Sequence, residues 1–354
     1  MNNKKITEFQ LLAKLQPEAF LLEPLIIYSL FPALARDRAD AVIEVGLADS
    51  TERFRFAVEA KTSSTPMAVQ MAIAQARAHT PDDELPMILV PYLSPERLDK
   101  LEKEQVSGID LCGNGLVIVP DRFYVLRTGQ PNQYRESRPL NNPYSGRSSL
   151  VARMLLVQPD WSSLKELAEA IREAGAQLSL PQASKSTKAL QNELIIAKNA
   201  KTIKLQEPLR LLDNLGRAWK KPEFRRREFL RLSPQRDWAN ALSGDSDLRW
   251  AVTGASSVSR YASFSQAGPL RIAVTNIAAA LERIKGKAEP VPSFADIELV
   301  ETDEPGFYFQ NESDEKGIRW ASRLQAWIEL QAGDARQQNA ARDIRKQILK
   351  GVEL

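Results

Sequence analysis

Alternating apolar and polar positions divide the first part of the chain into short strands and helices. Runs rich in Val, Ile, Phe and Ala at about 39–47 and 53–61 are joined by a polar segment, which predicts two neighbouring β-strands. A helix is predicted at about 66–79, because Pro66 suits a first helical turn and good helix formers follow it. Residues 7–35, interrupted by prolines, are predicted to be helical.

The next segment continues the alternation of strands and helices. MILVPYL (87–93) predicts a buried strand, and the amphipathic run after Ser94 predicts a helix with that serine at its N-cap. Short strands broken by Gly and Pro follow between 107 and 129. The segment 129–149 is dense in Gly, Pro, Asn and Ser and predicts a linker. We therefore expect a first α/β domain at 1–135 with a central mixed sheet.

Helical periodicity predominates after the linker and predicts the element order of a winged helix. An apolar helix comes first, and a second helix is capped by Ser162 or Ser163 and ends at Gly175. A third helix opens with Pro181, and the basic segment AKNAKTIKL follows it as a β-hairpin. We expect this winged-helix domain at 136–210.

The third helix and the hairpin carry the candidate DNA contacts. Ala183, Leu190 and Leu194 can face the core, which leaves short polar and basic side chains on the outer face. Such a face suits a recognition helix in the major groove, and lysines around a hairpin tip suit a wing on phosphates. A three-helix packing or dimerisation module with a solvated face is the alternative. The candidates are Gln182, Ser184, Lys185, Thr187, Lys188 and Gln191 on the helix and Lys198, Asn199, Lys201 and Lys204 on the wing.

The remaining residues, 211–354, begin with a basic segment and then alternate strands and helices. Five basic residues between 220 and 227 flank Trp219 and Phe224, a mixture that suits either a nucleic-acid backbone or a solubilising surface. Strands are predicted at RWAV, RIAVTN, ADIELVET and GFYFQN, and helices at WASRLQAWIELQ and DARQQNAARDIRKQIL. The TGASS turn (253–257) is similar to phosphate-cradling turns, but no Asp-x-Asp follows it, so transferase chemistry is not expected.

Three polar residues in the first two strands are the candidate catalytic group. Period-2 alternation puts Glu59 and Lys61 on one face of their strand, and Asp40 begins the strand before it. Two carboxylates and an ammonium can hold Mg²⁺ or Mn²⁺ beside a phosphodiester and position a water. Gln70 and Gln75 lie on the following helix, and Glu18 or Glu23 could contribute from the leading segment. An ordinary hairpin with solvated charges is the alternative reading.

Composition excludes several other kinds of chemistry. The 354 residues contain one cysteine, Cys112, and one histidine, His79, too few for zinc fingers, zinc hydrolases, HNH nucleases or histidine-based triads. A carboxylate–lysine centre needs neither residue type, so His79 is not expected to take part. The lone cysteine suits a reducing cytoplasm, and the sequence predicts neither a signal peptide nor a membrane span. Because the net charge is only +3, nucleic-acid affinity must come from local patches.

Two family resemblances combine these patterns. Asp40 on one strand and Glu59-x-Lys61 on the next, with a Gln-bearing helix after them, resemble the core of the PD-(D/E)xK nuclease superfamily, which places a Gln such as Gln75 near its metal face. The blocks GIDLCGNG, SGRSSLVARMLL, LLDNLGRAW and TGASS, in this order and with the closing helices, look like the AbiEi-type antitoxin and transcriptional regulator family. That resemblance implies a winged-helix DNA reader, a C-terminal α/β domain at 211–354 and a nucleotidyltransferase-like toxin as partner.

Three functions therefore compete. The first is a regulator that binds double-stranded DNA and whose front domain is a non-cleaving scaffold. The second is a Mg²⁺-dependent endonuclease targeted by its winged helix, in phage defence. The third is an antitoxin that binds its cognate toxin through the C-terminal domain. We favour the first because the AbiEi-type resemblance spans most of the chain, while the sequence leaves open whether the protein is a homodimer.

Overall fold

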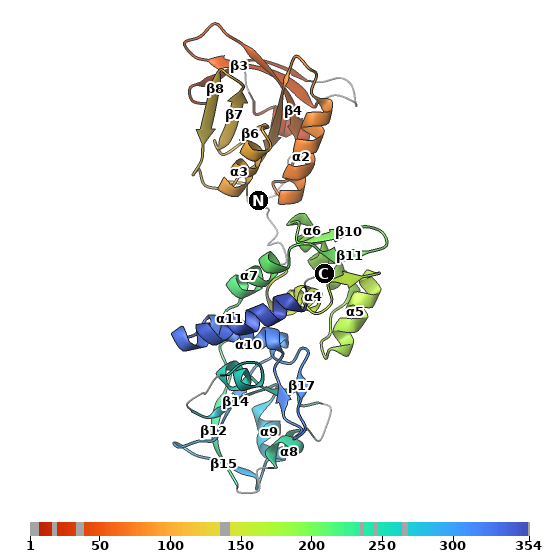
Figure 1. The fold of residues 1–354 in the computed structure, drawn as a ribbon, viewed down its shortest axis with the longest axis vertical. Helices are drawn as coiled ribbons and strands as arrows, with labels where there is room; N and C mark the ends of the chain where they lie inside the picture. Colours follow the sequence, from red (N-terminus) through yellow and green to blue (C-terminus); the bar gives the residue numbers. More distant parts are fainter. Residues whose placement is uncertain are drawn as a thin grey trace. The chain divides into compact units, whose positions relative to one another are not determined.

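The protein is a mixed α/β chain of two compact units, 1–140 and 141–354 (Figure 1). Strands of the described residues form sheets of eight, three and seven strands. No helix in these parts of the chain is long and apolar enough to cross a membrane. The computed structural model describes residues 7–15, 20–32, 39–134, 142–233, 237–243, 247–263 and 268–352.

The first unit is built on the eight-stranded sheet, whose strands lie side by side in chain order. Strands β1 to β4 form an antiparallel meander, β4, β5 and β6 are parallel neighbours, and β7 and β8 return antiparallel. The helices of this unit are α1 (Glu8–Leu12), α2 (Pro66–His79) and α3 (Pro95–Lys103). The strands are β1 (Phe20–Leu22), β2 (Leu25–Pro32), β3 (Ala41–Leu47), β4 (Phe54–Ala60), β5 (Leu85–Val90), β6 (Ser107–Asp110), β7 (Gly115–Val119) and β8 (Phe123–Arg127).

Among the described residues, the predicted helix at 7–35 is found only at its start. Helix α1 ends at Leu12, and the described residues from Phe20 to Pro32 are strands β1 and β2. Strand β2 is rich in β-branched and aromatic residues and pairs with β3 along nearly its whole length, with Leu25 and Ile27 in the core. Pairing and burial therefore override the helical pattern. The predicted strands at 39–47 and 53–61 and the helix at 66–79 are confirmed.

The two faces of β4 pack against different partners. Phe56, Val58 and Ala60 lie in a core that also contains Leu11 of α1. The other face of the sheet meets α2 and α3, where Ala72 and Ala76 of α2 pack with Ile88 of β5. Glu59 alternates with the first set and points to the α2 side, so its carboxylate is placed under a helix.

The second unit opens with three helices and a small sheet. The order of its strands is β10–β11–β9, all antiparallel. The Ser163 side chain caps α5 by accepting from the backbone N–H of Glu166 at 3.1 Å, as one of the two predicted caps. The elements are η1 (Gly146–Ser148), α4 (Ser149–Leu155), β9 (Asp160–Trp161), α5 (Leu164–Glu173), α6 (Leu180–Asn192), β10 (Ile196–Lys198) and β11 (Ile203–Leu205).

The rest of this unit is a seven-stranded mixed sheet with helices around it. The strand order is β15–β12–β16–β14–β13–β18–β17. The helical elements are α7 (Pro208–Ala218), α8 (Trp238–Leu242), η2 (Gly254–Arg260), α9 (Ile277–Arg283), η3 (Pro305–Phe307), α10 (Arg323–Gln331) and α11 (Ala335–Lys350). The strands are β12 (Arg227–Leu232), β13 (Trp250–Val252), β14 (Leu270–Val274), β15 (Ala288–Pro290), β16 (Ile297–Glu301), β17 (Glu312–Ser313) and β18 (Arg319–Trp320).

The predicted strand GFYFQN is instead the short helix η3 followed by a turn. Its three consecutive aromatic residues are all buried, which a half-buried strand would not allow. Phe307 and Tyr308 pack on one face of the seven-stranded sheet, while Phe309 enters the core of the three helices. The segment therefore joins two cores.

One hydrophobic core holds both parts of the second unit together. Leu150 of α4, Leu167 of α5 and Leu190 of α6 share it with Trp327 of α10 and Ile344 of α11. The ranges 136–210 and 211–354, expected as separate domains, thus lie in one compact unit that begins at Asn141. The expected boundary at 135/136 falls within 135–141, outside the described residues.

Candidate functional site

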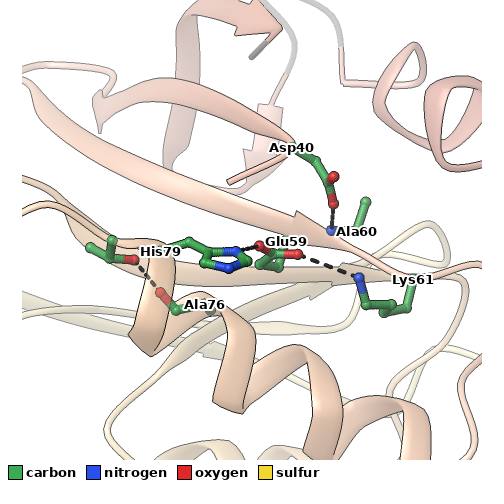
Figure 2. Close-up of polar contacts among 7 residues, drawn as sticks. Asp40, Glu59, Ala60, Lys61, Ala76 and His79 are labelled. Carbon is green, nitrogen blue, oxygen red and sulfur yellow. Dashed lines mark hydrogen bonds and ion pairs between the residues drawn. The ribbon is translucent and has the colours of Figure 1, made fainter. Parts of the chain in front are cut away.

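Asp40, Glu59 and Lys61 lie at the same end of strands β3 and β4 (Figure 2). Asp40 comes directly before β3, and its Oδ2 accepts a hydrogen bond from the backbone N–H of Ala60 at 2.8 Å. That bond continues the pairing of the two strands beyond Ala41, which pairs with Val58. Asp40 therefore has a structural task at this end of the hairpin.

Both oxygens of the Glu59 carboxylate have partners within the chain. Oε1 lies 2.5 Å from Nδ1 of His79, and Oε2 lies 3.4 Å from Nζ of Lys61. The Glu59 side chain is only 4% exposed, against 29% for His79 and 21% for Lys61. A buried carboxylate needs such hydrogen-bonding and charged partners. We call these three residues the Glu59 cluster.

His79 reaches this position because of how α2 is built. Thr65 caps the helix by accepting from the backbone N–H of Ala68 at 3.3 Å, and small residues on its inner face let it lie close to the sheet. His79 is the last residue of the helix and extends to Glu59 (Figure 2). Sequence reasoning did not expect this contact. The available signal was a lone histidine ending the helix that follows the Glu59 strand.

The other described residues expected near this site make no hydrogen bond to the Glu59 cluster that the structure records. Gln75 lies one turn before His79 on α2 and is half-buried, with an Oε1 that has no hydrogen-bond partner. Gln70 is exposed and accepts from Nζ of Lys100 at 3.3 Å. Glu23 is exposed in the turn between β1 and β2, and Glu18 lies outside the described residues.

The donor set of the Glu59 cluster does not fit a divalent metal ion in this arrangement. Glu59 offers no unpartnered oxygen, since an imidazole and an ammonium already engage it. One oxygen of Asp40 is likewise used by the backbone. Within the described ranges, no group of three or more His, Cys, Asp or Glu side chains could hold a metal. What the arrangement does offer is a buried carboxylate that orients a partly exposed imidazole.

Helix α6 and the β10–β11 hairpin form a second candidate surface, in the second unit. Ser184, Lys185 and Lys188 are exposed on α6, while Ala183 and Leu190 are buried as expected. The placement of Thr187 on the outer face is corrected: the residue is fully buried. Its hydroxyl donates to the carbonyls of α6 itself, at 2.8 Å to Ala183, so a buried threonine is satisfied without an external partner.

Other polar residues of this surface shape the helix and the hairpin. Gln182 forms a capping box with Ser179, which starts α6. Gln191 donates from Nε2 to the carbonyl of Lys198 at 3.1 Å, which fastens the hairpin to the helix. At the tip, Oδ1 of Asn199 accepts from the backbone N–H groups of Lys201 and Thr202, both at 2.8 Å. The turn therefore has a fixed shape, with Lys201 exposed beside it.

Two sequence blocks that might bind ligands prove to be internally bonded. In TGASS, the Ser256 hydroxyl accepts from the backbone N–H of Arg271 at 2.8 Å and that of Ser257 donates to the carbonyl of Gly254 at 2.9 Å. In GIDLCGNG, the buried Asp110 carboxylate accepts four N–H bonds of 2.7–2.8 Å, among them those of Leu93 and Asn114. These side chains therefore connect parts of the protein itself, and the two serine hydroxyls and the Asp110 carboxylate already have partners within the chain.

A second charged group, the Arg153 network, lies deep in the second unit. Arg153 of α4 donates from Nη2 to Oε1 of Gln325 at 2.9 Å, and Gln325 donates to Oε1 of Glu329 at 2.8 Å. The Thr253 hydroxyl donates to the same Glu329 oxygen. Gly306 makes room for the guanidinium, because a Cβ there would lie 2.6 Å from Nη2 of Arg153. The network ties α4, η3, α10 and the start of η2 to one another.

No known protein-family model matches this chain, and no curated protein matches it in sequence.

Proposed function

We propose that this protein is a DNA-binding transcriptional regulator of the AbiEi antitoxin type, acting in the cytoplasm. The observation that carries the proposal is a basic surface on α6 and the hairpin, formed by the exposed residues Ser184, Lys185, Lys188 and Lys201 and by the half-buried Lys198. We call it the α6–wing surface. The protein would use it to bind double-stranded DNA.

The order of elements supports this assignment. Helix, strand, two helices and a two-stranded hairpin, with the first strand joining the hairpin in one sheet, is the arrangement of a winged helix. In helix–turn–helix proteins the second helix of the motif, here α6, enters the major groove. Its buried residues, Ala183, Thr187 and Leu190, fix which side faces outward. The outward side carries the two lysines that could reach base edges or phosphates.

The charge along this segment also supports DNA binding. Residues 180–204 contain five lysines and one acidic residue, Glu193. Glu193 is engaged by the hydroxyl of Tyr144, and Lys204 pairs with Asp160 at 3.5 Å. The other four lysines have no ion-pair partner among the described residues. Lysines held without carboxylate partners are available to phosphates, which dominate protein–DNA affinity.

Fluorescence anisotropy with labelled duplexes tests the proposal, using the upstream region of the protein's own gene and a scrambled duplex. Lys185→Ala with Lys188→Ala should weaken binding by about 1–3 kcal/mol if these side chains reach bases. Lys198→Ala with Lys201→Ala should weaken both duplexes alike and lower the salt slope by about 2.

The control pair is Lys285→Ala with Lys316→Ala, two exposed lysines outside this surface. It should leave both duplexes unaffected. Equal affinities for the unmodified protein and both α6–wing pairs would overturn the assignment. The antitoxin part of the proposal implies a cognate toxin as partner and leaves room for a homodimer. Co-purification with the product of an adjacent gene, when the two are co-expressed, tests that part separately.

A second candidate function is that of a PD-(D/E)xK-type endonuclease in phage defence. One observation favours it: Asp40, Glu59 and Lys61 come to the same end of adjacent strands, and a β4–α2–β5 crossover follows them. The occupied oxygens of Glu59 weigh against a metal there. Plasmid nicking in Mg²⁺ or Mn²⁺ that is lost in Lys61→Ala would support cleavage. No nicking by the unmodified protein on duplex, single-stranded DNA or RNA would leave this region as a scaffold.

A further inference from the structure

The two faces of the seven-stranded sheet are covered to different extents. Helices α8 and α9 pack on one face, where Trp238 and Ile277 meet Leu230, Trp250 and Leu299 (Figure 1). On the opposite face, Ala273 and Val300 are covered by Phe307, Tyr308 and Phe224. This second cover lies over the rows that contain Ala273 and Val300. The next row along these strands, which runs through Phe229, Glu298 and Arg271, carries a different set of side chains.

A row of three residues crosses this remaining part of the face. Phe229 of β12 pairs with Glu298 of β16, and Glu298 pairs with Arg271 of β14, so their side chains point the same way. Arg227 and Arg231 lie two residues to either side of Phe229 on β12 and share its face. Phe229 is 42% exposed although it sits within a strand that has neighbours on both sides. We call Arg227, Phe229, Arg231 and Arg271 the Phe229 face.

The electrostatics of this face favour a negatively charged occupant. Glu298 is buried beneath the arginines, where it accepts from Nε of Arg271 at 2.8 Å and lies 3.9 Å from Nη1 of Arg227. Glu298 therefore holds the Arg271 guanidinium on this face while exposing little charge of its own, and the Arg227 guanidinium lies over the Phe224 ring, 5.1 Å from its centroid. Arg231 has no ion pair in the described parts of the chain and lies opposite Glu289, the exposed carboxylate on β15.

We propose that the Phe229 face binds single-stranded nucleic acid, with a base stacked on the Phe229 ring and phosphates on the arginines. Exposed aromatic rings on a sheet, flanked by arginines, are how several folds hold unpaired bases. A single aromatic ring among guanidinium groups is too small an apolar patch for a folded protein partner of standard size. This activity goes beyond duplex binding by the α6–wing surface, and it uses different residues.

Anisotropy of labelled single-stranded oligonucleotides of about 12 nucleotides, in DNA and RNA versions, tests this proposal. Phe229→Ala should weaken binding about tenfold or more, since stacking one base on an aromatic ring contributes in that range. Phe229→Trp should retain or improve it. Arg231→Ala should weaken binding and flatten the salt dependence, because one phosphate contact is lost.

Phe31→Ala is the matched control, since Phe31 is also an exposed phenylalanine of a strand, at 53%, but belongs to the first unit. It should bind like the unmodified protein. Thermal unfolding of each variant checks that the fold is intact, and Phe229→Trp separates a lost ring from a lost fold. Undetectable oligonucleotide binding, or equal affinities for the unmodified protein and Phe229→Ala, would overturn the proposal.

The two proposals fail independently. Phe229→Ala should leave duplex binding unchanged, and the Lys185 and Lys188 double variant should leave single-strand binding through Phe229 in place. If duplex binding is absent but single-strand binding depends on Phe229, only the regulator assignment falls.

Discussion

The Glu59 cluster of the first unit and the Arg153 network of the second unit both combine a carboxylate with a cationic side chain, but they differ in which group is exposed to solvent. In the Glu59 cluster the carboxylate is buried, but His79 and Lys61 remain 29% and 21% exposed. In the Arg153 network the cation itself is buried, with only 2% of the residue exposed. One arrangement leaves its cationic partners accessible to solvent, and the other encloses its cation between helices.

Burial changes the acid–base properties of the enclosed group. Desolvation lowers the pKa of Arg153 to about 10, with the carboxylates of Glu304 and Glu329 acting against that shift. Desolvation also raises the pKa of Glu329, and the hydrogen bonds from Thr253 and Gln325 counter it. The Arg153 network joins elements through its hydrogen bonds, and its buried guanidinium is not accessible to a substrate. Only the Glu59 cluster is open enough for chemistry with an external molecule.

The largest effect should come from truncating Arg153. Arg153→Ala removes the buried donor to Gln325 and leaves a space inside the second unit, which should cost about 2–5 kcal/mol. Tryptophan fluorescence during urea unfolding measures this selectively, since all six tryptophans lie in the second unit, at 161, 219, 238, 250, 320 and 327.

Arg172→Ala is the matched control for that measurement. Arg172 pairs with Glu169 on the surface of α5, so its loss should cost less than about 1 kcal/mol. Similar losses for the two variants would mean that the Arg153 network does not hold the second unit together, and the contrast between the two clusters would disappear.

A smaller effect is expected from Glu59→Gln. Neutralising Glu59 removes the charge that engages Lys61 and weakens the bond to His79, which should cost about 1–3 kcal/mol because both partners keep access to water. Hydrogen exchange of α2 reports the loss locally. The imidazole NMR signals are unambiguous, since His79 is the single histidine.

Glu52→Gln, in an exposed pair with Arg122, serves as the control for the first unit, because neither residue belongs to α2. It should change neither the exchange of α2 nor the His79 signals. If Glu59→Gln leaves those signals unmoved as well, the contact between Glu59 and His79 is not populated in solution.

The sequence predicts the local elements around the Glu59 cluster because its members are close along the chain. Asp40, Glu59, Lys61 and His79 span 40 residues, and strand and helix periodicities place most of them. His79 was missed because the side-chain direction at a helix end depends on how α2 packs on the sheet. The strand β2 was missed because its pairing with β3, which overrides a helical pattern, is not a local property.

The Arg153 network could not be predicted in the same way. Its members, Arg153, Thr253, Gln325 and Glu329, come from segments far apart along the chain, and the bonded pair Arg153 and Gln325 is separated by 172 residues. Within α4, Arg153 looks like an ordinary charged position on an amphipathic helix. It is buried because other parts of the second unit cover α4 on several sides, and the pattern of apolar residues within α4 does not reveal this cover. For the same reason Thr187 was expected on the exposed face of α6 and is instead on its buried face.

The smallest effect, and the sharpest test of the contrast, is expected from Glu329→Gln. The residue is half-buried, but its carboxylate is surrounded by protein, and its pKa in the folded protein lies above the ordinary value of 4.5. The folded state therefore binds this proton more tightly than the unfolded state. The protonated Glu329 side chain therefore stabilises the fold fully below pH 4.5, and this stabilisation is lost as the pH rises through the pKa of the folded protein.

Glutamine keeps an acceptor for Thr253 and Gln325 and carries no charge. At neutral pH the variant should equal or exceed the unmodified protein in stability, by up to about 1 kcal/mol. Urea unfolding at pH 4, 5, 6 and 7 measures this. A variant that is less stable by the same amount at every pH would show that the folded protein does not disfavour the ionised form of Glu329.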